Sequence, residues 1–177
     1  MIQALVFHLS KVKQLFFVSF FTALAVATPA IFHFFGGIGA GRTFLPMHIF
    51  ILTAGLVLGW RAGLAVGVLT PLLSHSITSM PALALLPFIL IEASIYGLFS
   101  GWLRQEMNLG VYPALVGAMV AGRIFLMLSI WLLPANFSAF AYVVGAIKAG
   151  WIGILIQLAL VPFVVKAINN FLRDERI

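Results

Sequence analysis

Long apolar runs, separated by short polar or glycine- and proline-containing segments, dominate this sequence. The runs are continuously apolar rather than alternating, and most approach the roughly 20 residues that a helix needs to cross the hydrocarbon core of a bilayer. The pattern predicts an all-α integral membrane bundle, built as a single domain over residues 1–177. Its six transmembrane helices are expected at about residues 12–35, 45–59, 61–78, 83–103, 111–133 and 140–171.

Composition supports a membrane location for the whole chain. Apolar residues make up 63% of the 177 positions, charged residues make up 8%, and the mean hydropathy is +1.18. A soluble domain carries about 25% charged residues. Six helices and their connections leave no room for a soluble catalytic or ATP-hydrolysing domain. The absence of cysteine excludes disulfides, thiolate metal ligands and cysteine nucleophiles.

The first apolar run also has features of a secretory signal peptide. Lys11 and Lys13 precede it, and small residues at positions 25–27 resemble a cleavage site. The run continues past Pro29 to Phe35, however, which is longer than the apolar core of a signal peptide. We therefore expect a retained first helix.

Cations are scattered singly at the expected helix ends, which is the pattern of a topology signal rather than of a nucleic-acid surface. With the N-terminus inside, the cytoplasmic segments hold Lys11, Lys13, Arg61, Arg104, Lys166, Arg173 and Arg176. The opposite side holds Arg42. This bias predicts that both termini are cytoplasmic and gives no support for a nucleic-acid partner.

Three charged residues fall inside expected membrane helices: Glu92, Arg123 and Lys148. An uncompensated charge costs about 2.5–3.5 kcal/mol at the centre of a membrane helix, and such residues usually face a partner or a wet cavity. All three lie in the outer half of the bundle or near its middle, and so do His48, His75 and His33. This asymmetry predicts a binding pocket open to the outside, whereas a channel would place polar groups along its whole length.

A structural alternative remains open, in which Glu92 pairs with Arg123 while Lys148 extends its ammonium group to the interface. One acid against two bases leaves one cation that a substrate carboxylate or phosphate would match. Each histidine also has a structural, hydrogen-bonded alternative. A metal site at His48 and His75 lacks a third ligand, so neither a metal nor a cofactor is expected. Aromatic residues near this level that would contact a ring-containing ligand, or form the interfacial belt, are Phe44, Tyr96, Trp131 and Trp151.

The segment between the first two helices, residues 36–43, is rich in glycine and matches the spacing G-x-x-x-x-G-R-T. A phosphate-binding P-loop has this spacing, but it follows a strand in a nucleotide-binding domain. We expect instead a flexible lid over the pocket, with glycines Gly36, Gly39 and Gly41 and with Arg42 at its tip.

Small residues recur at four-residue spacing, as in Ala23 and Ala27 or Gly97 and Gly101. Such pairs allow helices to approach closely in lipid. Close packing inside the bundle is the simplest expectation for the glycine pairs at 55 and 59, 63 and 67, and 97 and 101.

The sequence resembles the substrate-binding (S) components of energy-coupling factor (ECF) transporters over essentially its whole length. The segments that carry the resemblance are Ala-Leu-Ala-Val-Ala at 23–27, Phe-Leu-Pro-Met-His-Ile at 44–49, Ala-Gly-Leu-Val-Leu-Gly at 54–59, Leu-Thr-Pro-Leu-Leu-Ser at 69–74, Glu-Ala-Ser-Ile-Tyr-Gly at 92–97 and Ala-Gly-Arg at 121–123.

This resemblance implies a multi-pass subunit of a prokaryotic cell membrane that binds a vitamin or vitamin precursor from outside. Its implied partners are a transmembrane coupling (T) component and two cytoplasmic ATPases. The resemblance places Ala23 and Ala27 at the contact with the coupling component and residues 36–43 at the gate. It places Glu92, Arg123, Lys148 and His48 in the substrate region. The Pro-Met-His-Ile segment favours pantothenate, and an α-ribazole or benzimidazole-type cobamide precursor is the alternative.

Two other classes of function would also place polar residues within membrane helices. A membrane enzyme using Ser74, His75 or Glu92 is disfavoured. Ser74 and His75 are adjacent in the sequence, so on a helix their side chains point about 100° apart. A nucleophile needs its base within hydrogen-bond reach, which makes this pair a poor catalytic dyad. A stand-alone carrier or channel would transport a solute without ATPases. The expected function is therefore non-enzymatic substrate capture.

Overall fold

The computed structural model describes the backbone of residues 10–133, 135 and 137–174, and the side chains of these residues except at positions 33, 38, 40 and 171–174. Regular secondary structure within this part of the chain is entirely helical: α1 (Lys11–Phe44), α2 (Pro46–Leu58), α3 (Trp60–Thr78), α4 (Leu86–Gln105), α5 (Val111–Leu132) and α6 (Ala139–Asp174). The predicted all-α bundle of six helices is confirmed. Arg176 lies outside the described residues, and so do the side chains of His33 and Arg173.

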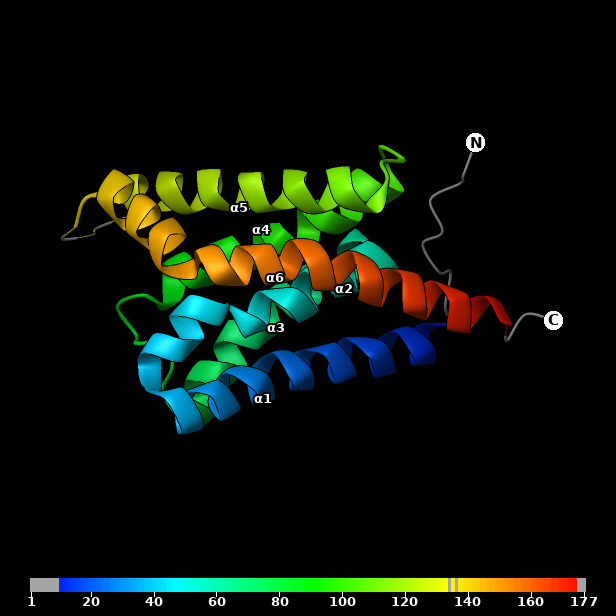
Figure 1. Ribbon diagram of the computed structural model, residues 1–177, viewed down its shortest axis with the longest axis horizontal. Coiled ribbons are helices and arrows are strands. Elements are labelled where there is room, and N and C mark those ends of the chain that lie inside the picture. The colour runs from blue at the N-terminus through cyan, green and yellow to red at the C-terminus, as the bar shows by residue number, and fades with distance from the viewer. Residues whose placement is uncertain (1–9, 134, 136, 175–177) are drawn as a thin grey trace.

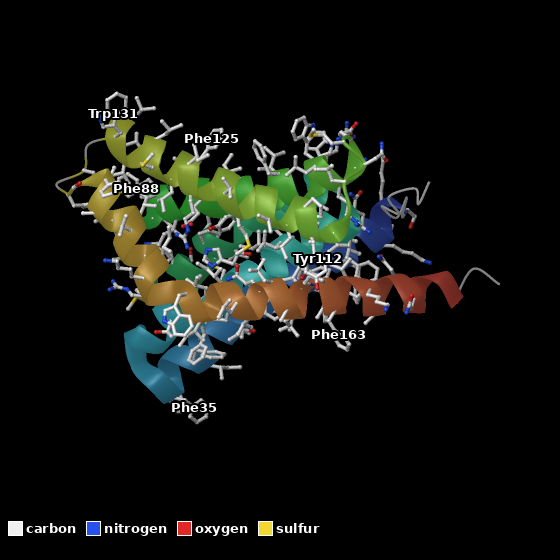
Figure 2. All side chains as sticks on the ribbon, turned by 45° about the horizontal axis from the view of Figure 1, so that its top comes forward. Phe35, Phe88, Tyr112, Phe125, Trp131 and Phe163 are labelled. Carbon is white, nitrogen blue, oxygen red and sulfur yellow. The ribbon has the colours of Figure 1, made fainter. Side chains whose placement is uncertain are left out.

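Five segments are long and apolar enough to cross a bilayer: Lys11–Gly37, Gly41–Leu58, Leu86–Gln105, Val111–Leu132 and Ala139–Asn170. Lipid offers no hydrogen bonds to the backbone, so an apolar run there satisfies its peptide groups by forming a helix. The helix α3 is not among these five segments; its 19 residues include polar side chains such as Thr70 and Ser74. Large apolar side chains, including Phe35, Trp131 and Phe163, project outward from the helices (Figure 2). The protein is a multi-pass membrane protein.

The helices run alternately up and down, so the start of α1 and the end of α6 lie at the same end of the bundle (Figure 1). We call this end the terminal end; it holds the α2–α3 turn and the α4–α5 connection. The other end, here the distal end, holds the α3–α4 and α5–α6 connections. Lys11, Lys13, Arg61, Arg104 and Lys166 all lie toward the terminal end. Which end faces the cytoplasm remains a prediction from these charges.

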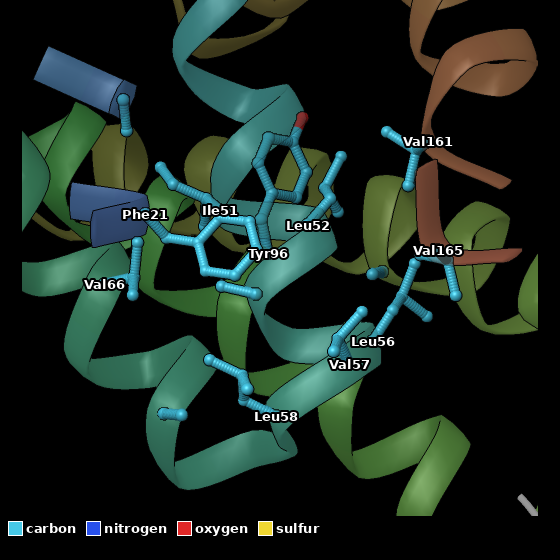
Figure 3. Packing of buried hydrophobic residues seen from close by; sticks show 14 of the residues in the cluster. Phe21, Ile51, Leu52, Leu56, Val57, Leu58, Val66, Tyr96, Val161 and Val165 are labelled. Atoms are coloured by element: carbon cyan, nitrogen blue, oxygen red, sulfur yellow. The ribbon is translucent and has the colours of Figure 1, made fainter. Parts of the chain in front are cut away.

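The central helix is α2, which contacts all five other helices. Its apolar side chains Ile51, Leu52 and Leu56 are fully buried and pack with residues of α1, α3, α4 and α6 (Figure 3). Pro46 begins α2, as expected for a residue with no amide hydrogen to lose in the first turn. The core of the bundle therefore forms around α2.

Glycines bring α2, α3 and α4 into backbone contact. A Cβ atom on Gly97 of α4 would collide with the Gly63 carbonyl of α3, and one on Gly55 of α2 would collide with the Ser100 side chain of α4. Gly67 meets the Ala93 carbonyl in the same way. The expected role of these glycines in close internal packing is confirmed.

The prediction of a flexible loop at residues 36–43 is wrong. The chain leaves the helical conformation at Gly37, where φ is 66° and ψ is −173°, and then resumes a helix that continues to Phe44. Glycine adopts this left-handed φ without steric cost. Residues 41–44 fall within the second segment that is long and apolar enough to cross a membrane, Gly41–Leu58.

Candidate functional site

An ion pair between Glu92 of α4 and Arg123 of α5 lies inside the bundle. Arg123 Nη1 is 2.7 Å from Glu92 Oε1, and the side chains are 15% and 6% exposed, respectively. Glu92 lies on the face of α4 that is buried along its length. Arg123 follows Gly122, which is also buried against α4. Two opposite charges that are excluded from water stabilise one another strongly, and either one alone would be costly.

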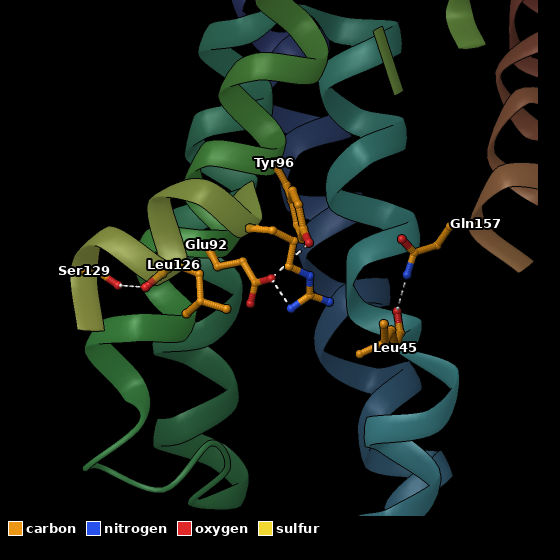
Figure 4. Close-up of polar contacts among 7 residues, drawn as sticks. Leu45, Glu92, Tyr96, Leu126, Ser129 and Gln157 are labelled. Carbon is orange, nitrogen blue, oxygen red and sulfur yellow. Dashed lines mark hydrogen bonds and ion pairs between the residues drawn. The ribbon is translucent and has the colours of Figure 1, made fainter. Parts of the chain in front are cut away.

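Tyr96 extends this ion pair by one helical turn. Its hydroxyl donates a hydrogen bond to Glu92 Oε1 at 2.9 Å (Figure 4). The two residues are four positions apart on α4, so they share one face of the helix. Gly122 of α5 lies against the Tyr96 ring, where a Cβ atom would collide with the ring. Glycine at this position therefore lets α5 bring Arg123 close to α4.

His48 of α2 completes the group. Its ring meets Tyr96 edge-on, with centroids 5.1 Å apart and planes at 77°. His48 is 7% exposed, and neither ring nitrogen has a hydrogen-bond partner among the described residues. The Leu45 carbonyl lies nearby but outside hydrogen-bond geometry. A buried polar group without a hydrogen-bond partner lowers the stability of the fold by about 1–3 kcal/mol. The burial of His48 therefore calls for an explanation beyond packing.

We call His48, Glu92, Tyr96 and Arg123 the buried polar cluster. The three helices that supply it place it at a common depth. His48 lies about 10 Å along the second membrane segment, Glu92 about 9 Å along α4 and Arg123 about 13 Å from the distal end of α5, all measured from the distal side. The sequence predicts that these residues lie in the outer half of the membrane or near its middle; that the distal side is the outer side remains a prediction from the charges.

Nothing in the sequence indicated that Tyr142 of α6 lies beside the buried polar cluster. It interacts electrostatically with both Glu92 and Arg123 of the cluster, and also with Arg42. It lies in the first turn of α6, where a tyrosine is also a common interfacial residue, so its type alone did not distinguish it. Only the packing of α6 beside α5 places its hydroxyl near the ion pair.

The other predicted site residues lie outside the cluster. The Nδ1 atom of His75 hydrogen-bonds the Pro81 carbonyl at 2.8 Å, which ties the end of α3 to the following turn. Lys148 is exposed on α6 and has no ion-pair partner among the described residues. Trp151 is 57% exposed. Phe44 packs on Phe32 of α1, with ring centroids 5.3 Å apart. The structure therefore brings together His48, Glu92, Tyr96 and Arg123, and it leaves the predicted substrate residues His75, Lys148, Phe44 and Trp151 outside the cluster.

The segment predicted to be the gate packs against α6. Small residues of α6 contact the end of this segment, since a Cβ on Gly153 would collide with the Thr43 carbonyl and one on Gly150 would press against the Arg42 carbonyl. Gln157 donates a hydrogen bond to the Leu45 carbonyl at 3.4 Å (Figure 4). Leu45 itself has a left-handed φ of 48°. Gly36 and Gly39 are exposed, and so is the Arg42 side chain.

Two hollows lie in the described part of the bundle, and no residue of the buried polar cluster lines either of them. One of about 380 Å³ lies between α1, α2 and α6 and is lined mainly by apolar residues, Phe44 among them. The other, about 700 Å³, lies where α5 gives way to α6, around Trp131 and Phe137. The cluster borders neither hollow and is largely buried, which differs from the open pocket expected from the sequence.

No known protein family, curated protein or solved structure matches this chain. The geometry of the buried polar cluster is therefore the basis on which a function is assigned. Among the described residues no group of three or more potential ligands (histidine, cysteine, aspartate or glutamate) is placed to hold a metal ion.

Proposed function

We propose that this protein is the substrate-capturing subunit of an ECF-type importer for a water-soluble vitamin or vitamin precursor. The observation that carries the proposal is the buried polar cluster, in which charged and hydrogen-bonding groups from three helices meet within a membrane protein. Ionisable residues within membrane segments are rare, and they commonly mark substrate or ion pathways.

The cluster has unused hydrogen-bonding capacity that a ligand would fill. Both ring nitrogens of His48 are free of partners among the described residues, and the recorded contacts of the ion pair converge on Glu92 Oε1 alone. An arginine has five N–H donors, so Arg123 retains donors for a ligand carboxylate. Pantothenate is accordingly the first ligand to test, and an α-ribazole or benzimidazole-type precursor is the second.

The outward face of α1 suits the proposed contact with a coupling component. Ala23 and Ala27 are exposed, whereas Ala25 and Val26 between them are buried. Small residues four positions apart let a second helix approach closely within lipid. A capture subunit of this size would obtain its energy from partner ATPases through such a contact.

His48→Phe tests whether the cluster recognises a ligand or only stabilises the fold. Phenylalanine keeps an aromatic ring beside Tyr96 and removes two buried nitrogens without partners, so the free energy of unfolding should stay within about 1 kcal/mol of the wild type or rise. Affinity for the ligand should fall by about tenfold or more, because a hydrogen bond to the ligand would be lost. Isothermal titration with candidate vitamins and thermal unfolding in detergent measure the two effects. Unchanged affinity would remove His48 from the site.

Ala23→Trp tests the docking assignment. An indole on the exposed face of α1 should leave ligand affinity unchanged and should lower uptake in cells or proteoliposomes by at least about tenfold, since it would hold a partner helix away. Ala159→Trp, an exposed alanine on α6, is the matched control and should transport normally. Equal uptake by both variants would contradict docking through α1.

Mass spectrometry of small molecules that copurify with the protein would identify the ligand directly. Reconstitution distinguishes the proposal from a stand-alone carrier or channel. We expect the purified protein to bind its ligand but not to transport it without ATPases, and uptake by liposomes that contain this chain alone would overturn the proposal.

A further inference from the structure

We propose that Arg104, together with Arg61, binds the phosphate of an anionic phospholipid headgroup at the terminal end of the bundle. This site is separate from the buried polar cluster and does not depend on the proposed transport function.

Arg104 is a buried cation without a partner. It lies in the last turn of α4 and is 7% exposed, and its Nε atom is enclosed without a hydrogen-bond partner. Within the described part of the chain no carboxylate or carbonyl accepts a hydrogen bond or forms an ion pair with its guanidinium. The nearest acid in the sequence, Glu106, is exposed and makes no such contact either. A buried charge in this state is expected to have an external counter-ion.

Helix capping does not account for Arg104. Arginine near a helix C-terminus often hydrogen-bonds the last free carbonyls. Here the Trp102 carbonyl already accepts a hydrogen bond from the Glu106 amide at 2.8 Å, and the Leu103 carbonyl accepts one from the Leu109 amide at 3.1 Å. A carbonyl oxygen can accept a second hydrogen bond, but the buried Nε atom of Arg104 has no acceptor among the described residues, so it is left for a group outside the described chain.

A second guanidinium lies at the same turn. Gly101, three residues before Arg104 on the buried face of α4, is in direct contact with the backbone of Gly59 and Trp60. Arg61 follows Trp60 and folds back over its indole ring, with Cζ 5.0 Å from the ring centroid. Two arginines from α3 and α4 thus flank the α2–α3 turn. A planar guanidinium group matches a phosphate, to which it can donate two hydrogen bonds.

The depth of the site indicates a lipid rather than a soluble anion. Trp102 is exposed near the terminal end of α4, and Tyr112 is exposed near the terminal end of α5. Exposed tryptophan and tyrosine side chains concentrate at the headgroup level of a membrane. The two arginines therefore lie where lipid phosphates are found.

Native mass spectrometry with short-chain phosphatidylglycerol tests this site. We expect Arg104→Gln to weaken binding of phosphatidylglycerol by about fivefold or more relative to wild type, since one arginine near a lipid surface contributes about 1 kcal/mol and this one is buried. Arg61→Gln should have a smaller effect in the same direction. Lys166→Gln, which removes an exposed cation of α6 near the same end, is the matched control and should change binding by less than about twofold.

Three comparisons decide between lipid and other occupants. Equal binding of phosphatidylcholine and phosphatidylglycerol by the wild type would overturn the site. Displacement of phosphatidylglycerol by millimolar inorganic phosphate would overturn the lipid assignment in favour of a free anion. If Arg104→Gln does not fold, Arg104→Lys replaces it in the experiment, because lysine keeps the positive charge but lacks the planar set of N–H donors of a guanidinium group. It is expected to bind phosphatidylglycerol more weakly, and wild-type binding by a folded Arg104→Lys would refute the proposal.

Discussion

Arg123→Ala is expected to lower the free energy of unfolding by about 3–5 kcal/mol and to abolish ligand binding. Removing the guanidinium leaves Glu92 as a buried carboxylate whose remaining contact is the Tyr96 hydroxyl, and a buried ion without its partner destabilises by this amount. Thermal unfolding in detergent, followed by circular dichroism, measures the first effect, and ligand titration measures the second.

A double variant separates a structural ion pair from a ligand-binding one. In Glu92→Gln/Arg123→Met both charges are gone, so most of the stability lost by Arg123→Ala should return, as happens when buried ion pairs are replaced by neutral groups. If the pair also recognises the ligand, this stable variant should still fail to bind. A folded double variant with wild-type affinity would show that the pair only stabilises the bundle.

Gly97→Leu is expected to prevent folding of the bundle. The Gly97 backbone lies against the Gly63 carbonyl of α3, and this part of the interface is made of main-chain atoms that cannot move aside as a flexible side chain would. Overpacking a core costs about 1–3 kcal/mol where side chains can adjust, and we expect a loss above that range here. The measurement is the yield of monodisperse protein by size-exclusion chromatography, together with its thermal midpoint.

Gly145→Leu is the matched control for this prediction. Gly145 is an exposed helical glycine of α6 with no atom near the position of a Cβ, so leucine there should leave yield and thermal midpoint unchanged or slightly raise them. Comparable yields of the two leucine variants would mean that α3 and α4 do not pack through Gly63 and Gly97.

The sequence alone determined the class of the protein and the approximate position of every helix. Apolar runs about 20 residues long form helices in lipid, because the backbone must satisfy its own hydrogen bonds there. The glycine pairs of α2, α3 and α4 were recognisable for a similar reason, since close approach of helices in lipid needs small residues at regular spacing. Glu92 and Arg123 stood out because charges are rare within such runs.

Only the tertiary structure decided which of the polar residues meet. His48 and Tyr96 lie on different helices, and their contact depends on the rotation and depth of α2 against α4. Lys148 looked equivalent to Arg123 along the chain, yet it lies on an exposed face of α6. The glycine-rich segment at residues 36–43 was expected to be a loop from its local propensity, but it is helical beyond Gly37 and its end packs against α6. Local sequence predicts the length and apolar character of a helix, whereas the direction in which a side chain points is set by contacts between residues far apart in the chain.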